Sequence, residues 1–162
     1  VPEPKNLVVV IDDDVLLREH IGLVLENAGY QVALFAEPPT AIQFLQEQQP
    51  ALILLDLMFP NQRWPAFEVI NDIRGETAQR TPVAVMSGRA DFRSRLQATR
   101  AGADAYLTKP LDEQQLLAIT QQLTAKHLQQ SWDQEIFGHR ACSFRLRWRQ
   151  RRSSALRLIC HP

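Results

Sequence analysis

Five short apolar runs, separated by amphipathic stretches, are the feature that most constrains the fold of this sequence. They cover residues 7–11, 31–35, 51–55, 82–86 and 105–107. The first run, residues 7–11, is continuous and rich in β-branched residues, which is typical of a strand buried on both faces of a sheet. The stretches after the runs predict helices over residues 15–28, 38–49, 67–74, 91–101 and 112 to about 127. Asp14 suits the N-cap of the first helix, and Pro38 suits the first turn of the second.

This order of elements defines the expected fold class. Five successive strand–helix units predict an α/β protein with right-handed crossovers and helices on both faces of a parallel sheet. We expect the strand order 2-1-3-4-5, followed by a basic C-terminal tail. In this architecture ligands bind at the carboxyl ends of the strands, so the chemistry is expected just after each apolar run.

Polar residues do follow the runs. The ends of the first, third, fourth and fifth runs carry Asp12-Asp13-Asp14, Asp56, Ser87-Gly88 and Thr108-Lys109-Pro110. Because the first and third strands are neighbours in the expected order, Asp12, Asp13 and Asp56 should converge on one small volume. Ionised carboxylates so close together repel one another, and a divalent cation relieves that repulsion. All-oxygen ligands indicate Mg²⁺.

Lys109 and Ser87 complete a site for a phosphoryl group. The lysine offers a positive charge and the serine a hydroxyl donor, which are the groups that the transfer of a phosphoryl group requires. The whole is an anion receptor built around a nucleophilic carboxylate, Asp56.

These segments together resemble a known family. The runs VVIDDD, LLDLMFP, AVMSG and GADAYLTKPLD are similar, in type, order and spacing, to the receiver domains of two-component response regulators. The resemblance covers roughly residues 6–127 and implies a flavodoxin-like signalling domain of a phosphorelay, cytoplasmic and not an enzyme. It also implies a histidine kinase or phosphotransfer protein as partner. The sequence has no run of 18 apolar residues, so we expect no membrane contact.

The resemblance assigns a role to each matched residue. Asp56 would be the phosphoacceptor, with Lys109 and Ser87 as the other catalytic groups. Asp13, Asp56 and the Met58 backbone carbonyl would ligate Mg²⁺ directly, and Asp12 largely through water. Ser87 and Tyr106 would form the switch, and the Lys109–Pro110 bond would be cis. The surface formed by residues 91–101, 105–107 and 112–127 would change on phosphorylation and support a homodimer.

Each of these residues also has a simpler interpretation. Asp14 is more readily a helix cap than a ligand, and Asp12 and Asp13 can be solvated acids at a strand end. Ser87 can satisfy a loop amide, Lys109 can be a surface lysine, and Tyr106 can be a half-buried strand aromatic. Lys109 is, however, one of only three lysines among 18 basic residues. A lysine at this position is therefore less readily accidental.

The loop after Asp56 departs from the family pattern. It is about two residues longer, because residues 61–66 precede Phe67-Glu68, and Ala66 stands where the family typically has glycine. Trp64 in this loop can shield the site or contact a partner.

Charge divides the chain into two parts. Residues 139–162 hold seven arginines and no acid, which leaves residues 1–138 with 11 basic residues against all 18 acidic ones. We expect a receiver domain over residues 1–128, followed over residues 129–162 by a helix extension and a basic tail or linker. Residues 144–151 alternate arginine with apolar or neutral residues and can contact nucleic acid, although a disordered or non-native tail is the favoured interpretation. A DNA-binding regulator and a phosphate-independent interaction module remain the alternatives.

Overall fold

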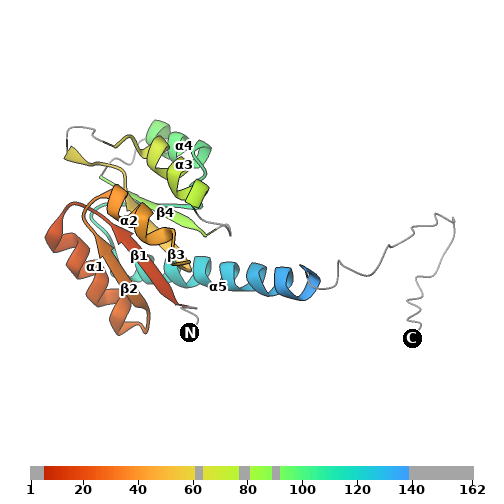
Figure 1. The fold of residues 1–162 in the computed structure, drawn as a ribbon. Coiled ribbons are helices and arrows are strands. Elements are labelled where there is room, and N and C mark those ends of the chain that lie inside the picture. The colour runs from red at the N-terminus through yellow and green to blue at the C-terminus, as the bar shows by residue number, and fades with distance from the viewer. Residues whose placement is uncertain (1–5, 61–63, 77–80, 89–91, 139–162) are drawn as a thin grey trace, which may run out of the picture.

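The structure is a computed structural model of the 162-residue chain. It describes residues 6–60, 64–76, 81–88 and 92–138, and the predictions for the basic tail lie outside these ranges. Five strands and five helices alternate along the described chain (Figure 1). Their bounds are β1 Leu7–Ile11, α1 Val15–Asn27, β2 Gln31–Phe35, α2 Pro38–Leu45, β3 Leu52–Asp56, α3 Ala66–Glu76, β4 Val83–Ser87, α4 Phe92–Arg100, β5 Ala105–Thr108 and α5 Glu113–Gly138.

The strands form one parallel sheet in the order β2-β1-β3-β4-β5, which confirms the predicted fold class. Side chains alternate between the two faces, and in the three central strands β1, β3 and β4 both faces are buried, which explains their continuous apolar runs. The edge strand β2 is partly exposed. Val8 and Val10 belong to the core beneath α1 and α5, whereas Val9 and Ile11 belong to the core beneath α2 and α3. The helices therefore cover the sheet in two layers.

Two strands lie one residue further along the chain than predicted. We expected residues 51–55 and 82–86, whereas β3 ends at Asp56 and β4 ends at Ser87. Asp56 pairs with Met86, and Ser87 pairs with Thr108. The reactive side chains thus belong to the rigid ladder itself and not to the loops after it.

The prediction that the last helix ends near His127 was wrong. α5 continues to Gly138, and in Figure 1 its second half projects beyond the sheet. Residues 128–137 contain neither proline nor glycine, so nothing in the local sequence terminates the helix before Gly138. The first helix, in contrast, ends where expected, because Gly29 adopts a φ of 92°. Within the described residues no helix combines the length and the hydrophobicity that a bilayer-spanning segment needs.

Candidate functional site

The backbone of two adjacent strands, β1 and β3, brings the predicted acids together. Ile11 lies opposite Leu55 in the β1–β3 ladder, so the residues that follow, Asp12 and Asp56, emerge side by side. The Asp12 N–H donates to the carbonyl of Phe35 at 3.1 Å, and the Leu57 N–H donates to the carbonyl of Met86 at 3.0 Å. These bonds extend the ladder past both aspartates and hold their backbones in place.

The carboxylates of Asp12, Asp13 and Asp56 form one cluster. Each offers an oxygen, and these oxygens lie within 4.8 Å of one another. Asp12 and Asp56 are buried, with exposed fractions of 0% and 2%, while Asp13 is partly exposed. Asp56 Oδ1 has no hydrogen-bond partner in the part of the chain that the structure describes. A buried carboxylate oxygen without a donor, beside two further acids, fits a hard divalent cation.

Lys109 reaches this cluster from the end of β5. Its Nζ lies 2.8 Å from Asp12 Oδ2, with which it forms a hydrogen bond, and 3.1 Å from Asp56 Oδ1. The second contact is an ion pair, and Asp56 Oδ1 has no hydrogen bond among the described residues. The Lys109 backbone N–H donates to the Ser87 carbonyl at 2.8 Å, and the Lys109–Pro110 bond is cis, as predicted. The Lys109 ammonium therefore bridges Asp12 and Asp56 and does not pair with Asp13. The negative charge of Asp13 remains available to a further cation.

Both central groups have raised pKa values. Burial raises the pKa of Asp56, the charge of Lys109 opposes this rise in part, and Asp12 adds to it. Burial alone would lower the pKa of Lys109, but its hydrogen bond to Asp12 and the charge of Asp56 outweigh that effect and raise it. Lys109 is thus held as an ammonium ion, whereas the Asp56 carboxylate gains from any further cation that enters the site.

The other predicted site residues lie at the same edge of the sheet or just inside it. Ser87 is buried at the end of β4, and the Met58 backbone lies close enough to the Asp56 carboxylate to lower its pKa. Tyr106 lies further back, within β5, where it is half-buried beneath the Arg95 guanidinium, 5.3 Å from the ring centre. The structure therefore brings Asp12, Asp13, Asp56, Met58, Ser87 and Lys109 together and places Tyr106 behind them.

Two other residues that the sequence analysis considered, Asp14 and Trp64, have structural contacts. The Asp14 carboxylate accepts from the backbone N–H groups of Leu16 and Leu17, which confirms it as the N-cap of α1. The Trp64 ring packs edge-on against Phe59, with 5.6 Å between centroids, and joins the core beneath α2 and α3. This contact gives Trp64 a packing role in the longer loop.

The sequence prediction missed Arg18. Its Nη1 donates to the Asp12 backbone carbonyl at 2.6 Å, directly behind the acidic cluster. A long side chain that turns back six residues to a carbonyl leaves no periodic signal in a sequence.

Known proteins share this fold and this sequence pattern. Residues 8–121 match the family model described as the response regulator receiver domain. Over 126 residues the chain is 33% identical to the response regulator Rre1 of Synechocystis, an alignment that covers 76% of this chain and 53% of that protein. It is 32% identical over 112 residues to the phosphate regulon transcriptional regulatory protein PhoB of Escherichia coli, covering 68% and 48%. The chain thus spans about half the length of these curated relatives.

Among solved structures, the receiver domain of the sensor histidine kinase PA1611 of Pseudomonas aeruginosa matches with a TM-score of 0.66 and 25% identity. The match covers 74% of this chain and 98% of that one, and that structure has a magnesium ion coordinated in its active-site cleft. The chemotaxis protein CheY4 of Vibrio cholerae matches with a TM-score of 0.66 and 23% identity, over 73% of this chain and 98% of that one.

Proposed function

The chain belongs to the family of response regulator receiver domains of two-component signalling, and we propose that its Asp56 accepts a phosphoryl group from a histidine kinase or phosphotransfer protein. One observation carries this proposal. Asp56 is a buried carboxylate that faces an ammonium group at 3.1 Å and two further acids within 4.8 Å. A carboxylate in such a place serves poorly as a structural group and well as a nucleophile whose product carries more negative charge.

The transfer is a displacement at phosphorus. An Asp56 carboxylate oxygen bonds to phosphorus as the bond from phosphorus to the donor's imidazole nitrogen breaks, which leaves an acyl phosphate on Asp56 and the imidazole on the donor. Lys109 balances the charge on the phosphoryl oxygens, because its ammonium already lies between Asp12 and Asp56. The Ser87 hydroxyl, at the end of the adjoining strand, donates to one phosphoryl oxygen.

Mg²⁺ is the cation that we assign to the acidic cluster. The Asp13 and Asp56 carboxylates and the Met58 carbonyl would hold it directly, and Asp12 largely through water. When bound, the ion neutralises the carboxylates and the incoming phosphoryl oxygens. The donor-free Asp56 oxygen and the all-oxygen ligand set support the assignment, as does the magnesium in the Pseudomonas receiver domain.

The signal would leave the site through Ser87 and Tyr106. A phosphoryl group on Asp56 gives Ser87 and Lys109 a new partner, and this differential interaction favours one of two pre-existing conformations. Tyr106 lies beneath Arg95 of α4, so a shift of Ser87 toward the phosphate changes the packing between α4 and β5. The surface formed by α4, β5 and α5 is therefore the one we expect to change and to form a homodimer.

The test uses beryllofluoride or acetyl phosphate on the whole chain. Intact-mass spectrometry and amide chemical shifts should show modification of the wild type only when Mg²⁺ is present and no modification of Asp56→Asn. Asp72→Asn, which removes an exposed acid on α3, is the matched control and should behave like the wild type. Equal modification of wild type and Asp56→Asn would sink the assignment.

A further inference from the structure

Arg18 is a cation beside the acidic cluster that the proposed chemistry does not use. It lies in the second turn of α1, and its Nη1 reaches back across the N-cap to the Asp12 carbonyl at 2.6 Å. Its backbone N–H donates to the Asp14 carbonyl at 2.9 Å, so the helix that carries it starts from the same three aspartates. Side chain and backbone together bind the segment of residues 12–14 at two points.

The bond to this carbonyl affects Asp13 more than Asp12. The Asp12 carboxylate has its own anchors, since it accepts from the Asp14 N–H at 2.9 Å and from Lys109 Nζ at 2.8 Å. In the described part of the chain, the Asp13 carboxylate has neither a hydrogen bond nor an ion pair. The peptide bond is planar, so a fixed Asp12 carbonyl also fixes the N–H of Asp13. Arg18 is therefore the side chain that fixes the backbone position from which the Asp13 side chain extends.

On this basis, and assuming the proposed phosphoryl-acceptor function, we propose that Arg18 is a positioning residue that aims the Asp13 carboxylate at the cation site. The fact that Arg18 donates to a backbone carbonyl and not to a carboxylate supports this role. Within the described residues Arg18 forms no ion pair with Asp12, Asp13 or Asp56, although it lies behind them. A guanidinium bound to a carboxylate would compete with a metal for that ligand, whereas one bound to a carbonyl leaves the carboxylates free.

Two effects of removing Arg18 have opposite signs, which makes the proposal testable. Loss of a positive charge near the acids would, by electrostatics alone, strengthen the binding of a cation. Loss of an outer group that orients a metal ligand weakens metal binding, typically about ten-fold or more. A positioning role predicts the second result in spite of the first.

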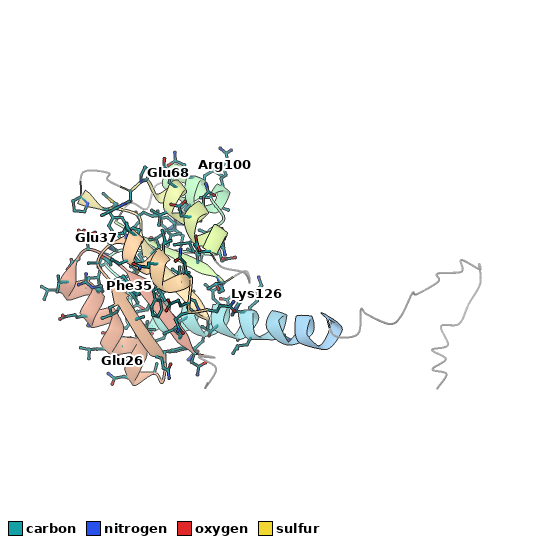
Figure 2. All side chains as sticks on the ribbon, viewed as in Figure 1. Glu26, Phe35, Glu37, Glu68, Arg100 and Lys126 are labelled. Atoms are coloured by element: carbon teal, nitrogen blue, oxygen red, sulfur yellow. The ribbon has the colours of Figure 1, made fainter. Side chains whose placement is uncertain are left out.

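The experiment is a titration of the full chain with MgCl₂ alone, followed by amide chemical shifts and thermal melts. We expect Arg18→Met to bind Mg²⁺ about ten-fold more weakly than the wild type. In the metal-free variant the Asp13 amide resonance should shift while amides of the sheet core stay in place. Arg100→Met removes the same charge from the far end of α4, well away from Glu37 at the carboxyl edge of the sheet in Figure 2. Its Mg²⁺ affinity should stay within roughly two-fold of the wild type because solvent and salt screen the distant charge.

The outcomes separate this inference from the function on which it rests. Mg²⁺ binding by Arg18→Met that equals or exceeds that of the wild type overturns the positioning role. If Arg18→Met does not fold, Arg18→Gln repeats the test, because its shorter side chain keeps an amide donor but does not span the six residues back to the Asp12 carbonyl. A wild type that does not bind Mg²⁺ at all would refute the proposed function itself.

Discussion

The two ends of the parallel sheet carry charged clusters of opposite character. At the amino end, Arg74 of α3 donates to the carbonyl of Thr81, to the carbonyl of Gly102 at 2.6 Å and to the Asp104 carboxylate at 2.7 Å. The same Asp104 oxygen accepts from the Val83 N–H at 2.9 Å, and the Asp104 N–H donates to the Val83 carbonyl at 2.8 Å. Here one cation meets one anion, and each has several hydrogen-bond partners.

At the carboxyl end the charges do not balance. Asp12 and Asp56 share one lysine, Asp13 has no ion pair among the described residues, and a buried oxygen of Asp56 has no hydrogen-bond donor among them. A cluster selected only for stability would resemble the amino end, since unsatisfied buried polar groups cost free energy. The difference indicates that the amino end holds the fold together, whereas the carboxyl end keeps capacity for a ligand that brings positive charge.

The largest stability effect should come from the amino end. Arg74→Met leaves the Thr81 and Gly102 carbonyls without their donor, so we expect the free energy of unfolding to fall by about 2 to 4 kcal/mol. The partly exposed Arg74–Asp104 ion pair should contribute little of this loss. Urea denaturation measures the change, and Arg100→Met serves as the control. Because this cluster lies at the opposite end of the strands from Asp56, Mg²⁺ affinity should be unchanged. A marked loss of Mg²⁺ affinity would contradict the proposal that the amino end stabilises the fold while the carboxyl end binds the cation.

At the carboxyl end, substitution of a charged residue should raise the free energy of unfolding instead of lowering it. Burial raises the pKa of Asp56 above its ordinary value of 3.8, so the ionised form destabilises the metal-free fold. Asp56→Asn should therefore increase the free energy of unfolding at neutral pH by about 1 to 3 kcal/mol.

The pH dependence follows from linkage. Between the unfolded pKa of Asp56 and its raised folded pKa, the folded state binds more protons, so wild-type stability falls as the pH rises through this window and stays low above it. The advantage of Asp56→Asn should shrink toward acid pH. Saturating Mg²⁺ should remove it at neutral pH, because the ion stabilises the wild type. Denaturation at several pH values, with and without Mg²⁺, measures both effects. If Asp56→Asn were less stable than the metal-free wild type at neutral pH, the buried Asp56 carboxylate would not destabilise the fold as we propose.

The same comparison shows what the sequence could and could not predict. The carboxyl-end cluster was predictable because parallel strands place the residues that follow them at one edge of the sheet. For this reason Lys109 and Asp56, which are far apart in the sequence, form an ion pair. The Arg74 cluster was not, since it depends on a long side chain that reaches Asp104 over 30 residues. The contact of Arg18 with the Asp12 carbonyl was not predicted for the same reason. The last helix was expected to end near His127 and to be followed by a helix extension, whereas α5 continues to Gly138 as one helix.

Asp14 sharpens the comparison, because it borders the acidic cluster and yet belongs with the structural residues. Its carboxylate accepts from Leu16 and Leu17 at 3.0 and 3.1 Å, and only its backbone N–H contacts Asp12. Asp14→Ala should lower the free energy of unfolding by about 1 kcal/mol, the usual effect of losing an N-cap, and Asp14→Ser should restore most of that loss. The backbone bond to Asp12 survives in both variants, so Mg²⁺ affinity should stay near that of the wild type. If the alanine variant instead bound Mg²⁺ much more weakly while the serine variant stayed stable but did not recover binding, the Asp14 charge would belong to the cation site. The carboxyl end would then hold four functional acids rather than three.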